Sequence, residues 1–159
     1  MQPDFRLLLS HPAHFISLGF GSGLSPRAPG TAGTLLGWLL YPLLRAPFDQ
    51  TGFLLLLVTL FVLGVFCAGH TGRALGVSDH GGIVWDEMVA IWLVLLFTPA
   101  TLAWQAAAVV LFRFFDIVKP PPVRWADRRL GGGFGVMADD IIAAGYSLLL
   151  LLPAAAIMA

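Results

Sequence analysis

Long apolar segments separated by short polar ones dominate this chain. Apolar residues make up nearly all of Ala32 to Leu44, Phe53 to Gly69, Met88 to Phe112 and Ile141 to Ala159. Each segment is long enough for a helix, and Phe53 to Gly69 has about the minimum length for crossing a bilayer. The pattern predicts an all-α fold, a small multi-helix integral membrane bundle.

The first two apolar segments form a predicted helical hairpin. The polar residues between 45 and 52 include proline and glycine and indicate a turn. Thr31 is the expected N-cap of the first helix, because a threonine hydroxyl can accept from a free backbone N–H. Gly33 and Gly37 have the spacing that lets a neighbouring helix approach closely.

The third apolar segment allows two interpretations. Met88 to Phe112 carries no charge, and Thr98-Pro99-Ala100-Thr101 lies in its middle, so it is either one proline-kinked span or two short half-depth helices. A single span would put Asp86 and Asp116 on opposite sides of the bilayer. We expect the hairpin, because it keeps the polar residues at both ends of the segment together.

Composition supports a membrane environment. Apolar residues make up 58% of the 159 residues and charged residues 11%, with a mean hydropathy of +0.85; soluble domains average roughly 45–50% and ~25%. So little charge leaves part of the surface for lipid to cover. The net charge of zero gives no case for nucleic acid, and the length predicts one domain, residues 1–159.

Neither the single cysteine nor the N-terminal segment suggests any chemistry. Cys67 is the only cysteine, lies in an apolar segment and indicates a buried thiol. The N-terminus lacks the pattern of a cleaved signal peptide. Phe5 to Leu18 resembles a short amphipathic piece at the interface, and we interpret its His11 and His14 as polar surface residues.

Charged residues concentrate in the polar loops. Arg45 lies at the far end of the first hairpin, whereas the other loops carry an excess of Lys and Arg, which places them in the cytoplasm. Acidic residues gather after residue 70, at Asp79, Asp86, Glu87, Asp116, Asp127, Asp139 and Asp140.

The glycine-rich loop from Gly19 to Thr31 is the first candidate site. Backbone N–H groups exposed by glycines just before a helix bind anions, and Arg27 adds a positive charge that suits phosphate. Taken alone, a tight surface loop explains these glycines better, because no Walker pattern is present.

The acidic pairs are the second candidate. Acids in the first turn of a helix complement its dipole, which would explain Asp86 or Glu87, and Asp139 could cap the last helix. Two adjacent acids point in different directions, however, so these explanations account for one acid of each pair better than for both. Arg113 and Asp116 could form a surface ion pair, and Lys119 could snorkel. Carboxylates at a membrane interface are costly unless paired or metal-bound. Hard oxygen ligands without a Cys or His cluster favour Mg²⁺, or Mn²⁺, and hence phosphate chemistry.

Four blocks of sequence resemble the phosphatidylglycerophosphatase A family. They are Gly21 to Thr34, Ile83 to Glu87, Phe112 to Pro121 and Gly132 to Asp140, which stand in the family's order and span most of the chain. The resemblance implies a Mg²⁺-dependent lipid phosphatase of the bacterial inner membrane, multi-pass with its site facing the cytoplasm. It would convert phosphatidylglycerophosphate to phosphatidylglycerol.

The expected roles follow from residue types and this resemblance. Acids supply the metal ligands and a base, and cations with the glycine loop hold the phosphate. A transporter or assembly protein without enzymatic activity is the alternative, as is another enzyme of lipid phosphates; the pattern of the CDP-alcohol transferases is absent. The expected metal ligands are Asp79, Asp86, Glu87, Asp116, Asp139 and Asp140, with Asp86, Glu87, Asp139 and Asp140 catalytic and Arg27, Gly30, Thr31, Arg113 and Lys119 binding phosphate.

Overall fold

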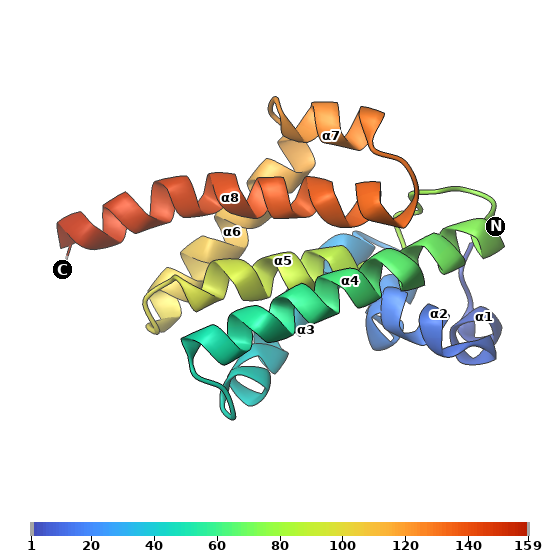
Figure 1. The fold of residues 1–159 in the computed structure, drawn as a ribbon, viewed down its shortest axis with the longest axis horizontal. Coiled ribbons are helices and arrows are strands. Elements are labelled where there is room, and N and C mark those ends of the chain that lie inside the picture. The colour runs from blue at the N-terminus through green and yellow to red at the C-terminus, as the bar shows by residue number, and fades with distance from the viewer. Residues whose placement is uncertain (1, 159) are drawn as a thin grey trace.

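The structure, a computed structural model, describes residues 2–158, apart from the side chain of Asp127. Within these residues the secondary structure is entirely helical, which confirms the predicted all-α class. The elements, shown in Figure 1, are α1 (Phe5–Ser10), α2 (Pro12–Ser17), the 3₁₀ segment η1 (Gly19–Leu24), α3 (Pro29–Arg45), α4 (Gln50–Leu75), α5 (Trp85–Leu96), α6 (Leu102–Val118), α7 (Val123–Arg129) and α8 (Gly132–Met158).

The first predicted hairpin is present as α3 and α4, although both helices are longer than expected. The Asp49 side chain accepts a hydrogen bond from the Gly52 N–H at 2.7 Å and starts α4 early. Gly76 ends α4 in the left-handed conformation, with φ of 78°. At the start of α3, Ala28 occupies the N-cap position and Pro29 the first turn, so the prediction that Thr31 caps this helix was wrong.

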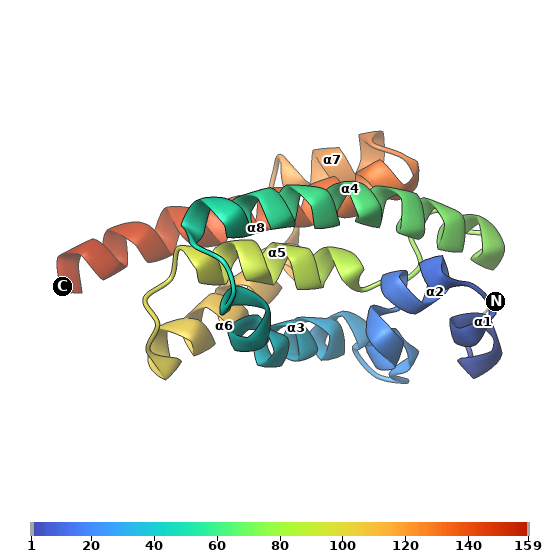
Figure 2. The same ribbon diagram turned by 60° about the horizontal axis from the view of Figure 1, so that its bottom comes forward.

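The segment from 88 to 112 is a second hairpin, as expected. Helix α5 ends at Leu96, residues 97–101 turn, and α6 begins at Leu102. Figure 2 shows this turn and the α3–α4 turn toward the same end of the molecule. The start of α5 and the end of α6 therefore lie on one side, which brings polar residues from both ends of the segment together.

Glycines bring the helices into close contact. A Cβ at Gly33 would lie 2.6 Å from the Val84 side chain, and a Cβ at Gly37 would lie 3.0 Å from Ile91, so the predicted neighbour of these glycines is α5. Gly133 of α8 lies against the Val65 carbonyl of α4, where a side chain has no room. Helix α8 thus starts at Gly132, nine residues before the predicted Ile141, because packing overrides the low helix propensity of glycine.

Two helices have the length and composition of membrane spans. They are α4 and α8, with mean hydropathy of 2.6 and 2.2 over their most apolar windows. Large apolar side chains point outward from the bundle, including Leu39, Leu55, Phe66 and Leu149. A surface of this kind needs lipid to cover it, so the chain is a small membrane bundle.

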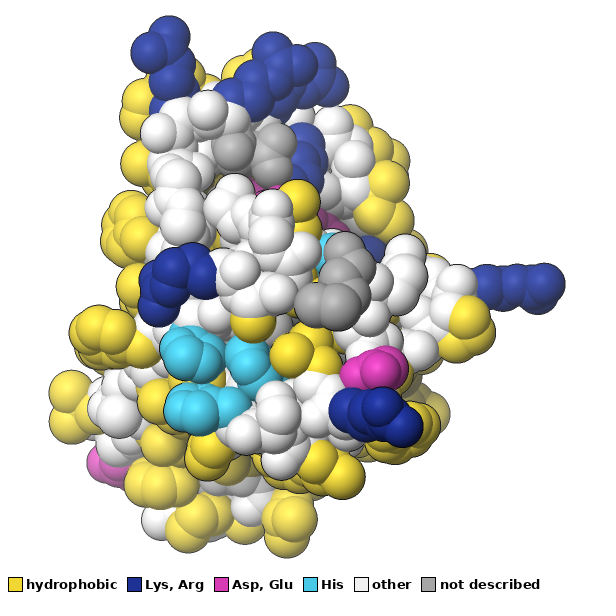
Figure 3. Space-filling model, turned by 90° about the vertical axis from the view of Figure 1, so that its right-hand side faces the viewer, with side chains coloured by type: hydrophobic (Ala, Val, Ile, Leu, Met, Phe, Trp, Pro, Cys, Tyr) yellow, Lys and Arg dark blue, Asp and Glu magenta, His cyan; other side chains and the backbone are white. Residues whose placement is uncertain are grey.

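The N-terminal helices pack at the end of the bundle where α8 begins (Figures 1 and 2). Here the expectation that His14 is a surface residue was wrong: His14 is buried, and its Nδ1 lies 2.8 Å from Thr71 Oγ1 on α4. Its ring also lies 5.1 Å from that of His70 and 5.7 Å from that of His11, between centroids. Figure 3 shows histidines side by side on this end of the molecule.

Candidate metal and phosphate site

Three helices, α5, α6 and α8, bring charged residues from distant parts of the chain to one place. Asp86 and Glu87 lie in the first turn of α5, and Asp139 and Asp140 lie on α8. The last turns of α6 contribute Arg113 and Asp116, and α3 begins beside them. The position of α5 is fixed partly by its first residue, Trp85, whose Nε1 donates to the Leu60 carbonyl at 3.1 Å. Sequence reasoning gave Trp85 no role, and no local pattern indicates this bond to another helix.

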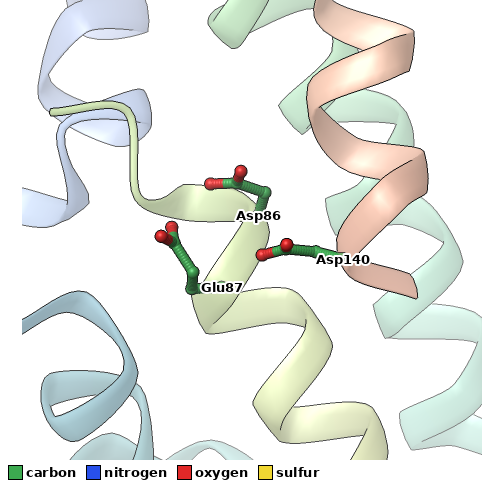
Figure 4. A group of neighbouring side chains, drawn as sticks. All are labelled: Asp86, Glu87 and Asp140. Atoms are coloured by element: carbon green, nitrogen blue, oxygen red, sulfur yellow. The ribbon is translucent and has the colours of Figure 1, made fainter. Parts of the chain in front are cut away.

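Three carboxylates form the centre of this site. Asp86, Glu87 and Asp140 each place one carboxylate oxygen within 4.8 Å of the others (Figure 4). All three are buried, with exposed fractions of 8%, 9% and 3%. Among the described residues, one oxygen on each of the three has no hydrogen-bond partner. Buried, unpaired carboxylate oxygens are costly, so this group fits a bound cation.

The raised pKa values of the carboxylates also fit a bound cation. Burial raises the pKa of Glu87 to about 7, although a hydrogen bond from Asp86 and the nearby charge of Arg113 act in the opposite direction. Burial also raises the pKa of Asp86 well above its usual range, and the charges of Glu87 and Asp140 raise it further. Burial thus disfavours the charged form of both carboxylates, and a bound cation would restore it. Oxygen donors alone suit a hard divalent cation such as Mg²⁺.

Two cationic side chains border the carboxylates. Arg113 Nη1 lies 2.6 Å from Asp116 Oδ2 and 3.5 Å from Glu87 Oε1. Lys119 Nζ donates to Asp139 Oδ2 at 2.7 Å. Asp116 also faces Asp140. Asp116 and Asp139 thus each pair with one of the cations, and Arg113 also contacts the three-carboxylate group directly through Glu87.

Gly30 has a structural explanation at this site. A Cβ at Gly30 would collide with the Glu87 carboxylate and would lie 3.1 Å from the Arg113 guanidinium. The absence of a side chain therefore lets the start of α3 contact both residues. Thr31 follows in the first turn of α3 and is half-buried.

Two of the predicted site residues, Asp79 and Arg27, are exposed. Asp79 is exposed in the loop before α5 and lines a small pocket together with Asp139. Arg27 is exposed just before α3. The structure thus gathers Asp86, Glu87, Asp116, Asp139, Asp140, Arg113, Lys119 and Gly30, and Asp79 shares a pocket with one of them, Asp139.

Comparison with known proteins identifies the family. The model of the family described as phosphatidylglycerophosphatase A matches residues 15–155. The chain belongs to the phosphatidylglycerophosphatase A family. A relative named phosphatidylglycerophosphatase A from Haemophilus influenzae is 44% identical over 94% of this chain and 92% of its own length. One of the same name from Escherichia coli is 43% identical over 87% of this chain and 80% of its own length.

A third relative carries a different name. It comes from Bacteroides thetaiotaomicron, is provisionally named a phosphatidylinositol-3-phosphatase, and is 42% identical over 86% of this chain and 89% of its own length. No solved structure matches this member of the phosphatidylglycerophosphatase A family. All three relatives are named as lipid phosphatases, and the third differs from the other two in the lipid that its name gives.

Proposed function

We propose that this chain hydrolyses the terminal phosphomonoester of phosphatidylglycerophosphate, releasing phosphatidylglycerol and inorganic phosphate. The observation that carries the proposal is the buried group of Asp86, Glu87 and Asp140, in a chain whose close relatives are named for this reaction. Cations bordering buried carboxylates suit the binding of a divalent metal and a phosphate together.

Mg²⁺ is the proposed cofactor. Asp86, Glu87 and Asp140 would hold it, because their oxygens converge and include atoms without partners among the described residues. A bound Mg²⁺ would neutralise charge on the phosphate and acidify a water molecule. The site thus needs few protein ligands, since Mg²⁺ keeps several waters and binds substrate phosphate directly.

Other side chains would bind the phosphate and accept a proton from the attacking water. Arg113 and Lys119 border the carboxylates and would hold the phosphate oxygens, as Arg27 and the Gly30–Thr31 turn could from the start of α3. Water is the proposed nucleophile, and one of its protons must pass to a base. The Asp139 carboxylate, next to Asp140 on α8 and outside the three proposed metal ligands, is the proposed base.

The proposed location is the bacterial inner membrane, with several helices in the bilayer and the site facing the cytoplasm. Arg27 and Arg45 mark opposite ends of α3, and the end that carries Arg27 also carries the basic residues that close α4 and α7. An excess of positive charge favours the cytoplasmic side. Figure 3, the view onto this end, shows its Lys and Arg side chains.

The test is phosphate release from phosphatidylglycerophosphate by the purified protein, with and without EDTA and with Mg²⁺ restored. We expect EDTA to abolish activity, and Asp86→Asn and Asp140→Asn to lower it at least about a hundredfold. Asp49→Asn is the matched control, because Asp49 caps α4 away from the site and asparagine caps equally well. Activity that persists in EDTA would overturn the metal proposal. Faster phosphate release from a phosphoinositide than from phosphatidylglycerophosphate would overturn the proposed substrate.

A further inference from the structure

An apolar groove lies on the outside of the bundle between α4, α5 and α8. Its volume is about 280 Å³, and every residue that lines it is apolar. The lining includes Leu57, Val58 and Phe61 of α4, Val89 and Leu93 of α5, and Ile141 of α8.

The groove is open on its outer side and closed on its inner side. Val58 is 61% exposed at the outer edge, whereas Leu57 and Val89 are buried in the wall. A side chain or a lipid tail can therefore enter from the bilayer without any change in the helices.

The groove runs on from the carboxylate site. On α5, Asp86, Val89 and Leu93 follow at intervals of three and four residues and share one face of the helix. On α8, Ile141 directly follows Asp140. From Asp86 to Leu93 the path along α5 measures about 10 Å, at 1.5 Å per residue, so a molecule with a phosphate at the site can reach the groove.

We propose that this groove holds one acyl chain of the lipid substrate while its headgroup phosphate lies at the carboxylate site. The inference rests on the proposed function and names the part of the substrate that the groove recognises. A methylene chain fits a narrow apolar path without polar atoms, and the groove leads from the phosphate site toward the apolar end of the bundle. The groove would position the lipid rather than take part in the reaction.

The test compares two substrates in detergent micelles: phosphatidylglycerophosphate with palmitoyl chains and with butyryl chains. Val58→Trp fills the groove from its exposed edge, and Val62→Trp makes the same exchange on α4 at a position that is 49% exposed and outside the lining. We expect Val58→Trp to lower the ratio of kcat/KM, long chain over short chain, by about tenfold, the effect of withdrawing roughly two methylene groups from contact. Val62→Trp should leave the ratio unchanged.

A second measurement does not depend on turnover. A phosphatidylglycerol with a photoreactive diazirine in its chain should label the segments 54–61 and 89–93, and unlabelled phosphatidylglycerol should compete more strongly than phosphatidylcholine. Equal competition by both lipids, or an unchanged substrate ratio in Val58→Trp, would overturn the groove proposal. Wild-type protein that releases no phosphate from either substrate would instead overturn the proposed function, and the labelling would still decide whether the groove binds this lipid.

Discussion

Arg113 Nη1 lies 3.5 Å from Glu87 Oε1, and this ion pair joins the end of α6 to the start of α5. The two residues stand at the two open ends of one hairpin. The contact therefore holds a proposed metal ligand beside a proposed phosphate-binding group. It also depends on Gly30, because a Cβ there would collide with the Glu87 carboxylate.

Replacing Arg113 tests whether this cation acts on the substrate. We expect Arg113→Ala to lower phosphate release at least about a hundredfold, because it removes a donor for developing charge. Arg113→Lys should recover part of the activity, since lysine keeps the charge but loses the planar fork. The control is Arg129→Ala, at the exposed end of α7. Near-normal activity in Arg113→Ala would exclude a role for this side chain in catalysis.

Gly30→Ala should be strongly disruptive. The new methyl group would meet the Glu87 carboxylate and crowd the Arg113 guanidinium, so either the helices separate or the carboxylate leaves its position. Overpacking of this kind costs about 1–3 kcal/mol of stability, and we expect activity to fall with it. Gly145→Ala on α8 is the matched control, because a Cβ there meets nothing within 4 Å. Thermal unfolding in detergent and phosphate release measure the two effects, and equal behaviour of the two variants would contradict the structure.

The stability of the metal-free protein should fall as the pH rises from about 4.5 to about 7. Glu87 keeps its proton up to about pH 7 in the folded state, whereas in the unfolded chain it loses the proton near its ordinary value of 4.5. The folded state then binds more protons across this window, and stability decreases as they are lost. Asp86 acts in the same direction.

Added Mg²⁺ should reverse this loss. The metal competes with protons for the same oxygens, so its stabilising effect should be larger at pH 8 than at pH 5.5. The measurement is the unfolding temperature at each pH with and without Mg²⁺. Glu87→Gln should flatten the pH dependence of the metal-free protein, and a metal effect that is equal at both pH values would contradict the assignment.

The N-terminal helices should detach as the pH falls below about 6.5. Burial lowers the pKa of His14, and the nearby His70 and His11 lower it further. The folded state then holds this proton less well than the unfolded chain does, so stability is lost as the pH falls through the ordinary histidine value of 6.5 and below. Limited proteolysis of residues 5–24 between pH 7.5 and 5.5 measures the effect. We expect His14→Gln to weaken the pH dependence and His80→Gln, in a different loop, to leave it unchanged.

The sequence predicted which residues form the site better than it predicted which residues they contact. Apolar segments indicated the helices, and the need for Asp86 and Asp116 to converge indicated the α5–α6 hairpin, which the structure contains. The blocks of glycines and acids indicated the family, which the comparisons confirm. These features are local in the chain, so a single sequence carries them.

The errors concern contacts between distant residues. The burial of His14 depends on Thr71, on a different helix, and no spacing in the sequence predicts that pair. The early start of α8 depends on Gly133 packing against the Val65 carbonyl of α4, so a glycine run that predicts a loop is helical here.

The position of Asp140 on α8 also determines when the three carboxylates can come together during synthesis. Asp86 and Glu87 are made first, and the third carboxylate is added only with the last helix of the chain. During synthesis, a chain that has not yet placed α8 has two of the three carboxylates and lacks Asp139, the partner of Lys119. Placement of α8 is therefore the step that assembles the three carboxylates, so a chain cut before Asp139 is left without the full set.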